Sequence, residues 1–567
     1  MKACTNLQRS TTGRSVGFAL LLLVALTATL TGCITAPKEP DTTPLPPPSQ
    51  APALFREVSG QVGLAFQWGH EGRSPLTILD TAGGGAAFLD YDNDGRLDIL
   101  LIGKKVTLFH NEGERGFRDM TTLSGLNVTG ALMGCAIGDI DNDGFDDICI
   151  TGYKTLRIYR NVRGTGQFED VTTQSGLQLQ TPNDWNTSAG FADLDGDGWL
   201  DLVVCRYLDF TAKSRQYCEY PDPTGKQIST ACPPLYYPSQ SARMFRNRGK
   251  GVFDEKTSQL PAPHGSSLGI GFADYDDDGR MDFYIANDAQ PGDLYHNEGN
   301  FHFTNEGVRS GTGYNQEGHE QAGMGVDWGD YNQDGKLDLV VTTFDNEPKS
   351  LYRNLGKGAF AYSSFNVGIG DITKSRLAFG VCWFDYLNSG YPGLIMANGH
   401  VQDAIGKIRP PATYAQPLSL FRNQEGKAFQ MVNTEGGEVL QKPIVGRALA
   451  VGDYDNDGRM DVLIADAEGH PLLLHNESKE PSSWIGFRLK TKGRSAIGAR
   501  VTLKTDKGVR VAESQSCRSY LSACDTRVHF GLGSTQNITQ ATVRWADGKT
   551  QTVSAPQLNQ YTTIEEK

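Results

Sequence analysis

The sequence predicts an all-β protein, in which a closed ring of repeated sheets is followed by a small separate β domain. An internal repeat, the register of that repeat and an excess of glycine lead to this prediction. The 567 residues include 66 Gly and 26 Pro, a balance that favours many tight turns over long helices. The chain is too long for one hydrophobic core, so we expect at least two domains.

The repeat is centred on an acidic loop. The segment FLDYDNDGRLDILL at 88–101 recurs six more times along the chain. Each unit is long enough for about four short strands and their turns. The first aspartates of the seven copies are Asp90, Asp139, Asp193, Asp274, Asp330, Asp385 and Asp453.

The register of a second, Phe-led signature indicates how the ring closes. Its copies begin at Phe55, Phe117, Phe168, Phe253, Phe303, Phe360 and Phe429. The first copy precedes the first acidic loop, and the last unit lacks a copy of its own. We therefore predict a seven-bladed β-propeller over residues 55–478, with 55–64 supplying the outer strand of the last blade. Closure removes the exposed sheet edges of an open array, whereas a linear solenoid would need capping repeats.

The acidic loops follow the pattern D-x-[DN]-x-D-G-x-x-D, which is typical of a calcium site. Side chains at positions 1, 3, 5 and 9 offer only oxygen ligands, and the glycine permits a sharp turn. An EF-hand would instead need a glutamate at position 12 and flanking helices. Five loops are complete: Asp90/Asp92/Asp94/Asp98, Asp139/Asp141/Asp143/Asp147, Asp193/Asp195/Asp197/Asp201, Asp274/Asp276/Asp278/Asp282 and Asp453/Asp455/Asp457/Asp461. A sixth is Asp330/Asn332/Asp334/Asp338.

The remaining loop, which begins at Asp385, lacks ligands at positions 3 and 9, and we predict that it binds no metal. Asp-rich turns can also form through Asx hydrogen bonds alone. Six loops in register favour about six structural Ca²⁺ ions instead. Four crowded carboxylates without a cation would repel one another or take up protons.

Residues 479–567 form a second all-β module of short alternating strands with Gly-containing turns. The acidic loops and their Gly-Phe approach strands resemble FG-GAP (VCBS-type) repeats, as in the propellers of integrin α-chains. The segments AIGARV, HFGLG and VRWADG resemble the ASPIC/UnbV domain. Together they are similar to the cartilage acidic protein family and its bacterial lipoprotein members. That resemblance implies extracellular, calcium-bearing propellers and supplies no catalytic residues.

The N-terminal sequence is typical of an export signal. Residues 1–32 combine a basic start with a short apolar stretch, and they end in Leu-Thr-Gly before Cys33, like a lipobox. We expect Cys33 to be lipidated and residues 33–54 to be a Pro-rich tether. The expected location is the bacterial outer membrane or cell surface; an ordinary signal peptide is the alternative. The net charge of −13 excludes a typical nucleic-acid binder.

An even number of cysteines remains after Cys4 leaves with the signal and Cys33 takes lipid, which makes disulfides plausible in an exported protein. Sequence proximity suggests three pairs and leaves Cys205 and Cys382 unassigned. The suggested pairs are Cys135/Cys149, Cys218/Cys232 and Cys517/Cys524.

The entries to the inner strands, about ten residues before each acidic loop, are candidates for ligand binding. Propeller ligands commonly sit where such loops converge. The residues at this offset are Asp80, Asp184, Trp185, His264, Glu317, His319 and Glu320. An insertion at 207–243 adds the aromatic candidates Tyr217, Tyr220, Tyr236 and Tyr237. Solvated loop residues and aromatic packing against the propeller are the respective alternatives.

No motif of a known catalytic class is present, such as HExxH, G-x-S-x-G or a P-loop. The first functional hypothesis is a non-enzymatic, lipid-anchored propeller that binds a glycan, a peptide or a protein. The second is a polysaccharide-active hydrolase or lyase at the axial mouth. The third is a scaffold for an envelope assembly.

Overall fold

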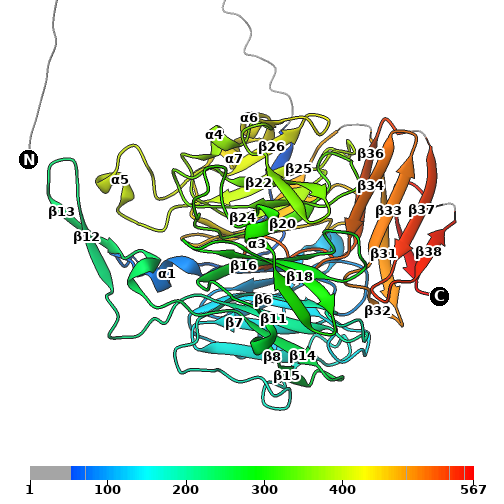
Figure 1. Cartoon of the computed structure of the whole chain (residues 1–567), viewed down its shortest axis with the longest axis horizontal. Helices are drawn as coiled ribbons and strands as arrows, with labels where there is room; N and C mark the ends of the chain where they lie inside the picture. The colour runs from blue at the N-terminus through cyan, green and yellow to red at the C-terminus, as the bar shows by residue number, and fades with distance from the viewer. Residues whose placement is uncertain (1–52, 71, 480–481, 536, 555) are drawn as a thin grey trace, which may run out of the picture. The chain divides into compact units, whose positions relative to one another are not determined.

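Antiparallel four-stranded sheets make up most of the structure, a computed structural model that describes residues 53–70, 72–479, 482–535, 537–554 and 556–567 (Figure 1). The all-β class is the one predicted from the sequence. The expected signal, the lipidation site at Cys33 and nearly all of the tether lie outside the described residues.

Seven sheets follow one another along residues 55–476 of the described chain, each with four antiparallel strands, and the first gains a fifth, parallel strand from residues 522–523. The first three comprise β2 (Gly85–Leu89), β3 (Asp98–Ile102), β4 (Val106–Asn111) and β5 (Phe117–Asp119); β6 (Leu132–Gly138), β7 (Asp147–Gly152), β8 (Thr155–Asn161) and β9 (Phe168–Asp170); and β10 (Asn186–Ala192), β11 (Asp201–Arg206), β14 (Arg243–Asn247) and β15 (Phe253–Glu255). The next two comprise β16 (Ser267–Ala273), β17 (Asp282–Asn287), β18 (Asp293–Gly299) and β19 (His302–Asn305); and β20 (Val326–Gly329), β21 (Asp338–Val341), β22 (Ser350–Gly356) and β23 (Ala359–Tyr362). The last two comprise β24 (Ala378–Phe384), β25 (Gly393–Asn398), β26 (Ser419–Asn423) and β27 (Phe429–Met431); and β28 (Gly446–Gly452), β29 (Asp461–Asp466), β30 (Leu472–Asn476) and β1 (Phe55–Glu57).

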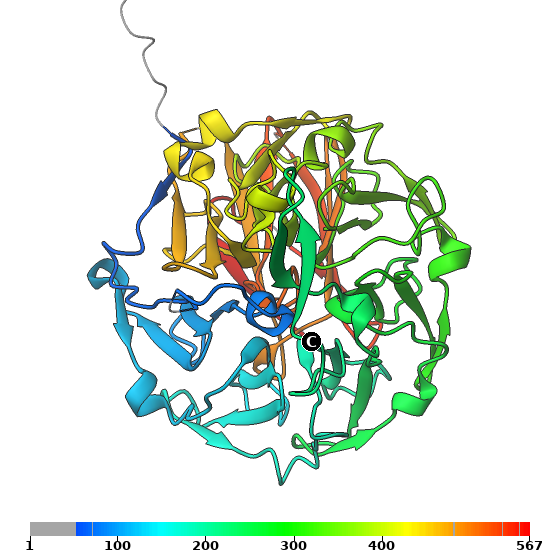
Figure 2. The same cartoon turned by 90° about the vertical axis from the view of Figure 1, so that its left-hand side faces the viewer.

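The first strands of the seven sheets form the inner ring of a propeller (Figure 2). Each packs against the first strand of the next sheet, and β28 packs against β2. The N-terminal strand β1 pairs with β30, with Phe55 opposite Asn476. Every residue of β2, β6, β10, β16, β24 and β28 is buried. The inner strands therefore belong to the core.

A recurring asparagine joins each sheet to its neighbour. In the first sheet, the Asn111 side-chain amide donates a hydrogen bond to the Tyr454 carbonyl of the last sheet, at 2.9 Å. The second sheet repeats this contact between Asn161 and the Tyr91 carbonyl, at 2.8 Å. The asparagines of the other five sheets make the same bond: Asn247, Asn297, Asn354, Asn423 and Asn476. In every sheet the residue before this asparagine is a histidine or an arginine, so the repeated [HR]-N motif of the sequence marks an inter-sheet contact that runs around the whole ring.

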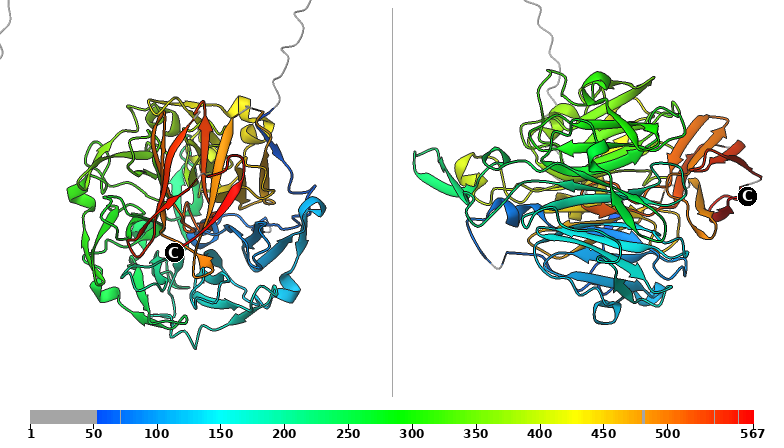
Figure 3. Two further views of the ribbon diagram at one scale, coloured as in Figure 1. Left: turned by 90° about the vertical axis from the view of Figure 1, so that its right-hand side faces the viewer. Right: turned by 60° about the horizontal axis from the view of Figure 1, so that its bottom comes forward.

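The C-terminal domain has two sheets that enclose their own hydrophobic core (Figure 3). One contains β31 (Ser483–Thr491), β32 (Arg494–Ser495), β36 (Val528–Gly533) and β39 (Tyr561–Glu565). The other contains β33 (Arg500–Thr505), β34 (Gly508–Glu513), β37 (Ile538–Arg544) and β38 (Thr550–Val553). The domain covers one face of the ring (Figures 1 and 3).

The remaining elements are short. The hairpin β12 (Tyr217–Pro221) and β13 (Gln227–Ala231) projects from the third sheet on the face opposite the C-terminal domain (Figure 1). The helices are α1 (Ile78–Ala82), α2 (Thr121–Ser124), α3 (Gly307–Ser310), α4 (Gly370–Thr373), α5 (Ile405–Ile408), α6 (Asn433–Gly436), α7 (Glu438–Gln441), η1 (Gly113–Arg115), η2 (Pro234–Tyr236) and η3 (Thr257–Gln259). Among the described residues, no helix has the length and apolar character needed to span a bilayer.

Candidate functional site

The acidic loops gather most of their carboxylates as the spacing predicts. In the first loop, Asp90, Asp92 and Asp94 offer oxygens within 4.8 Å of one another. Backbone amides shape the turn: Gly95 N–H donates to Asp90 Oδ2 at 3.1 Å. The other oxygen of Asp90 is buried and has no hydrogen-bond partner. An orphaned oxygen in an all-oxygen donor set fits a hard divalent cation.

The position-5 aspartates of the loops also make contacts within the turn. Asp143, Asp197 and Asp334, at position 5 of the loops in the second, third and fifth sheets, are exposed. Each accepts a hydrogen bond from the backbone amide two residues further on, at 3.1, 3.0 and 3.1 Å. Asp197 also pairs with Arg246 at 3.1 Å. Asn332, at position 3 of the loop in the fifth sheet, accepts a hydrogen bond from the Asp334 amide at 2.9 Å.

Asp94, Asp278 and Asp457 accept the same hydrogen bond in the other three loops, at 2.9, 2.9 and 2.8 Å. These are the Asx hydrogen bonds that were considered as the alternative to ion binding, and they recur in all six predicted calcium loops. The physical reason is that a short polar side chain reaches the amide two residues ahead with no help from a distant segment. Ion binding by Asp143, Asp197, Asn332 and Asp334 therefore stays a prediction, and it requires these side chains to give up or share their turn contacts.

The position-9 aspartate is buried in all six predicted calcium loops and is the first residue of the second strand of its sheet. Burial raises the pKa of Asp98 to about 7, although hydrogen bonds from His110 and the Asn111 amide lower it. Burial raises the pKa of Asp282 to about 8 and that of Asp461 to about 7 in the same way. Without a cation, the loops therefore carry a large electrostatic penalty at neutral pH.

Three loops also contain a histidine that the sequence analysis did not count among the ligands. His110 Nδ1 lies 3.1 Å from Asp98 Oδ1 and 3.6 Å from Asp92 Oδ2. His296 and His475 occupy the same place in the fourth and seventh sheets. The sequence could have indicated these histidines through the [HR]-N motif. The asparagine of the motif faces the neighbouring sheet, and the residue before it faces the acidic loop.

The loop that begins at Asp385 has a different role. Asp385 accepts hydrogen bonds from the Ser389 and Gly390 amides. A Cβ added at Gly393, position 9 of this loop, would lie 2.5 Å from the Tyr386 ring, so the site has no room for an aspartate. The C-terminal domain packs here instead, where Gly533 N–H donates to the Asn388 carbonyl at 2.7 Å. This loop is a domain contact.

Arginines of the C-terminal domain contact the acidic loops directly. Arg488 Nη1 lies 3.3 Å from Asp90 Oδ2, and Arg544 pairs with Asp274. Arg527 Nη2 donates to the Asp453 carbonyl at 2.6 Å. Two further arginines contact loop carbonyls, Arg494 that of Gly198 and Arg500 that of Asp274. Nothing in the sequence indicated that the basic residues of the second module face the acidic loops of the first.

Residues 514–527, here called the plug, leave the C-terminal domain and fill the axis of the ring. β35 (Ser522–Ala523) pairs in parallel with β2. Ser519 exchanges backbone hydrogen bonds with Val326 of β20, at 2.7 and 3.1 Å. The plug also contacts the other five inner strands, through Gly134, Ala189, Ile270, Val381 and Leu449. The propeller therefore has a closed axis.

Polar contacts fix the plug at both ends of the axis. The Arg518 guanidinium donates two hydrogen bonds to Asp327, at 2.8 and 2.7 Å. Bidentate pairs of this kind are among the strongest hydrogen-bonded contacts in proteins. The Tyr520 hydroxyl donates to the Ala82 carbonyl of α1 at 2.8 Å. The plug thus extends from the acidic-loop face to the opposite face.

A cavity of about 240 Å³ opens on that opposite face. Tyr520 is part of its lining, and apolar wall residues come from α1, from Leu268 of β16 and from Met324, which precedes β20. The insertion of the third unit contributes residues 231–235 to the lining. Two carboxyl side chains also line it, Asp288 and Glu347. We call this cavity the axial pocket.

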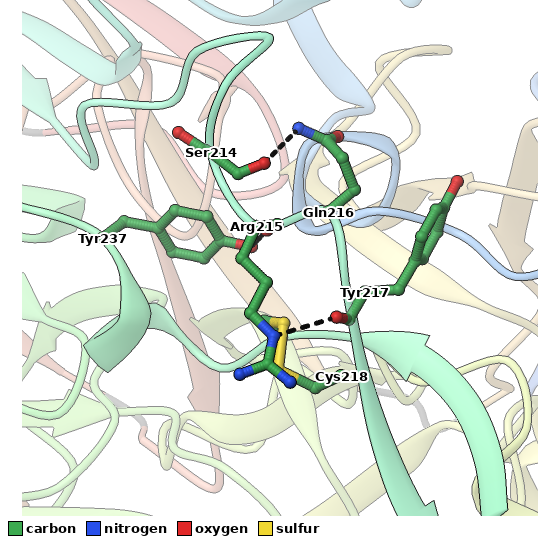
Figure 4. Close-up of a disulfide and its surroundings, with 7 residues drawn as sticks. Ser214, Arg215, Gln216, Tyr217, Cys218 and Tyr237 are labelled. Carbon is green, nitrogen blue, oxygen red and sulfur yellow. Dashed lines mark hydrogen bonds between the residues drawn. A yellow bond between two sulfur atoms is a disulfide. The ribbon is translucent and has the colours of Figure 1, made fainter.

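The insertion is held in place by a disulfide between Cys218 and Cys232, one of the three pairs suggested by the sequence (Figure 4). Tyr237 is buried, and its hydroxyl donates to the Arg215 carbonyl at 2.7 Å. Its ring packs 5.6 Å from that of Phe210. Aromatic packing against the propeller therefore accounts for Tyr237, whereas Tyr217 and Tyr236 are exposed and Tyr220 is partly buried.

The other two suggested disulfides are wrong. Cys135 faces Ile150 across the strand pair and Cys149 faces Ala136, so the two thiols lie on opposite faces of one sheet. In the plug, the Cys517 thiol contacts the Ala189 carbonyl, whereas Cys524 Sγ lies 3.7 Å from Cys382 Sγ. Cys205 is also a free, buried thiol.

Two of the predicted ligand residues belong to the core, and this prediction is also wrong. Trp185 is fully buried among aromatic rings. Asp184 is fully buried and pairs with Arg206 at 3.2 Å. It also accepts hydrogen bonds from backbone amides of its own loop, including that of Gln180 at 2.6 Å. Counting about ten residues back from the acidic loop located the start of the inner strand correctly. It gave no information on the direction in which the side chains point.

The other candidates from that set lie near the same face but do not line the axial pocket. Asp80 caps α1 through Thr77, and His264 Nδ1 lies 2.5 Å from Asp293. Glu317, His319 and Glu320 are exposed on one loop. The pocket carboxylates Asp288 and Glu347 were missed because they follow the second strands, an offset that the repeat does not mark.

Comparison with known families identifies both parts of the chain. Five overlapping segments match the FG-GAP-like repeat model, at residues 90–150, 139–204, 235–285, 274–341 and 330–396. Residues 489–567 match the model named ASPIC and UnbV. The chain contains FG-GAP-like repeats and an ASPIC and UnbV domain. The resemblance predicted from the sequence motifs is confirmed.

The chain is similar to cartilage acidic protein 1 over most of its length. It is 23% identical to the Xenopus tropicalis protein over 517 residues, which cover 85% of this chain and 73% of that one. It is 24% identical to the human protein over 496 residues, covering 82% and 69% respectively.

Two solved structures of lectins are also similar in fold. The first is an Agrocybe aegerita lectin that recognises non-reducing terminal N-acetylglucosamine, with a TM-score of 0.37 and 15% identity, covering 68% of this chain and 86% of the lectin. The second is the BP39L lectin of Burkholderia pseudomallei, with a TM-score of 0.43 and 8% identity, covering 70% of this chain and 97% of the lectin.

Proposed function

We propose that this protein is a calcium-stabilised, lipid-anchored binding module that takes a glycan, peptide or protein ligand at the axial pocket. The observation that carries the proposal is the separation of two faces by the plug. The acidic loops face the C-terminal domain, whereas the pocket opens beside α1 and the disulfide-bonded insertion. A concave, mostly apolar cavity with a few polar groups is the usual form of a ligand site.

Calcium would act structurally in this proposal. The carboxylates of the loops, such as Asp90 and Asp98, would hold the ion, and it would neutralise charge that burial makes costly. A loaded loop would also fix the position of its second strand, because the position-9 aspartate begins that strand. We infer that about six ions bind and that the Asp385 loop binds none. We also infer that a lipid on Cys33 anchors the protein in the bacterial outer membrane or at the cell surface.

The test is a binding screen of the full-length protein against glycans and envelope proteins, with Ca²⁺ and with EDTA. Leu235 lines the pocket and has an exposed fraction of 75%, so Leu235→Glu changes the site without disturbing the core. Leu123 is 60% exposed on α2, and Leu123→Glu is the matched control. We expect Leu235→Glu to weaken binding and Leu123→Glu to leave it unchanged.

Three results would contradict the proposal. A ligand whose binding is equally weakened by both variants, or by neither, would lie outside the axial pocket. Turnover of a bound polysaccharide would favour a hydrolase or lyase instead. A partner that contacts only residues 484–567 would favour a scaffold.

A further inference from the structure

The axial pocket is acidic and has no cation of its own. Its lining, as far as the structure describes it, includes Asp288 and Glu347 but no lysine, arginine or histidine. Asp288 Oδ2 accepts a hydrogen bond from the Tyr207 hydroxyl, and Glu347 Oε2 accepts one from the Ala322 amide at 3.0 Å. Both carboxyl groups are partly exposed, so a ligand in the pocket can reach them.

Two buried cations behind the pocket wall donate to backbone carbonyls, and a third, Arg215 of the insertion, lies over the Tyr236 ring at 5.1 Å. Lys349 is fully buried, and its Nζ donates to the carbonyls of Phe344 and Glu347, at 2.9 and 3.0 Å. Arg447 is also fully buried and donates to backbone carbonyls, including that of Thr81. Lys349 attracts the Glu347 carboxylate, whereas no cation among the described residues acts on Asp288, whose pKa is raised to about 7 by burial and by repulsion from Glu347.

The walls of the pocket suit the aliphatic and charged parts of a basic side chain. Leu268 and Met324 provide apolar surface along which a methylene stem can pack. Phe344, Phe379 and Tyr520 provide aromatic rings, which attract cations that lie against their faces. Arg447 already lies over the far part of this wall, with its guanidinium 4.3 Å from the centre of the Phe379 ring.

The surroundings of the mouth indicate that the cation belongs to a protein. Leu235, which lines the pocket, and the neighbouring Tyr236 are 75% and 53% exposed, and Tyr217 on the same insertion is 42% exposed. Exposed apolar and aromatic side chains beside a pocket are typical of protein interaction sites. A free small amine would leave this surface uncovered.

We propose that the axial pocket binds the side chain of an arginine or lysine residue from a protein partner, whose backbone lies against the insertion. The proposal rests on the proposed function, because it names the ligand class for the same pocket. The cation would pair with Asp288 and Glu347, its stem would contact Leu268 and Met324, and the flanking residues of the partner would cover Leu235.

The test measures binding of three probes to the full-length protein by isothermal titration calorimetry at low salt. The probes are acetyl-Leu-Arg-Leu-amide, the same peptide with norleucine in place of arginine, and free agmatine. We expect the arginine peptide to bind at least about tenfold more tightly than the other two. Asp288→Asn keeps an acceptor for the Tyr207 hydroxyl and should abolish the preference. Glu317→Gln on the exposed loop is the control and should preserve it.

Each alternative result has a distinct meaning. Equal or tighter binding of the norleucine peptide, weakened by Leu235→Glu, would overturn the cationic ligand class but keep the pocket as the binding site. Agmatine that binds as tightly as the arginine peptide would overturn the protein source. An arginine preference that survives both Asp288→Asn and Glu347→Gln, in variants with unchanged thermal unfolding, would place the cation elsewhere. No binding of any probe would overturn the ligand class, and the pocket itself would then be judged by the separate screen.

Discussion

Removal of calcium should make the stability of the protein fall as pH rises. The reasoning concerns the position-9 carboxyl groups, of which Asp98 is an example. Burial raises the pKa of Asp98 from 3.8 to about 7 in the folded chain without a cation. The folded state then binds more protons than the unfolded state between these two values. Its stability contribution is lost as pH rises towards the folded pKa.

The magnitude follows from the width of that window. Between about pH 5.5 and about pH 8, Asp98 loses its proton in the folded state but is already ionised in the unfolded state. About 1.5 pH units at about 1.4 kcal/mol each give a loss of about 2 kcal/mol in the free energy of unfolding. The position-9 aspartates of the other predicted calcium loops act in the same direction: Asp147, Asp201, Asp282, Asp338 and Asp461.

The assay is urea unfolding at both pH values, with excess Ca²⁺ and with EDTA. With Ca²⁺ the carboxylates are paired, so the pH-dependent loss should disappear and the difference between the two conditions should widen at the higher pH. In EDTA, Asp98→Asn should reduce the pH-dependent loss by about 2 kcal/mol. A chelated protein whose stability is constant or increases between these pH values would refute the reasoning.

Three further predictions concern the core, the plug and the insertion. Asp184→Asn should cost about 3–5 kcal/mol in urea unfolding, because it leaves Arg206 buried without its partner; a loss of binding at full stability would contradict this. Gly190→Ala places a Cβ 2.7 Å from that of Cys517, so it should cost about 1–3 kcal/mol and speed proteolysis of the C-terminal domain; unchanged proteolysis would argue against a seated plug. Cys218→Ser opens a loop with a sequence separation of 14 and should remove about 3 kcal/mol of local stability, read as cleavage within 219–231; an insertion that stays resistant would show that aromatic packing suffices.

Much of the ring could be predicted because the repeat marks specific backbone positions. Asp98 is conspicuous in the sequence, and in the structure it begins β3, so the motif locates the turn and the following strand. The register of the Phe-led signature placed Phe55 beside the last unit, where β1 pairs with β30. Motifs of this kind predict local structure because each residue stabilises a nearby backbone conformation, such as a turn or the start of a strand.

The candidate ligand site was harder to predict because it depends on contacts between distant segments. The plug reads as a polar loop in the sequence, SQSCRSYLSACDTR, with no hydrophobic periodicity. Its burial arises only because the seven first strands surround it. Asp184 shows the same limit, since a carboxylate at a strand entry can face solvent or an internal arginine, and only the position of Arg206 decides between them.

The plug also imposes an order on the assembly of the chain. β1 stays without its partner until β30 has been synthesised, and the axis is filled only by residues 514–527 that follow later. Until then, the axis is unfilled and some backbone groups of the first strands have no hydrogen-bond partner. The Val326 amide is one example, because its acceptor is the Ser519 carbonyl of the plug. A chain that stops before the plug would therefore expose the apolar side chains and unpaired backbone groups of the inner strands to chaperones and proteases. The axis of the ring is therefore completed only after residues 514–527 have been made.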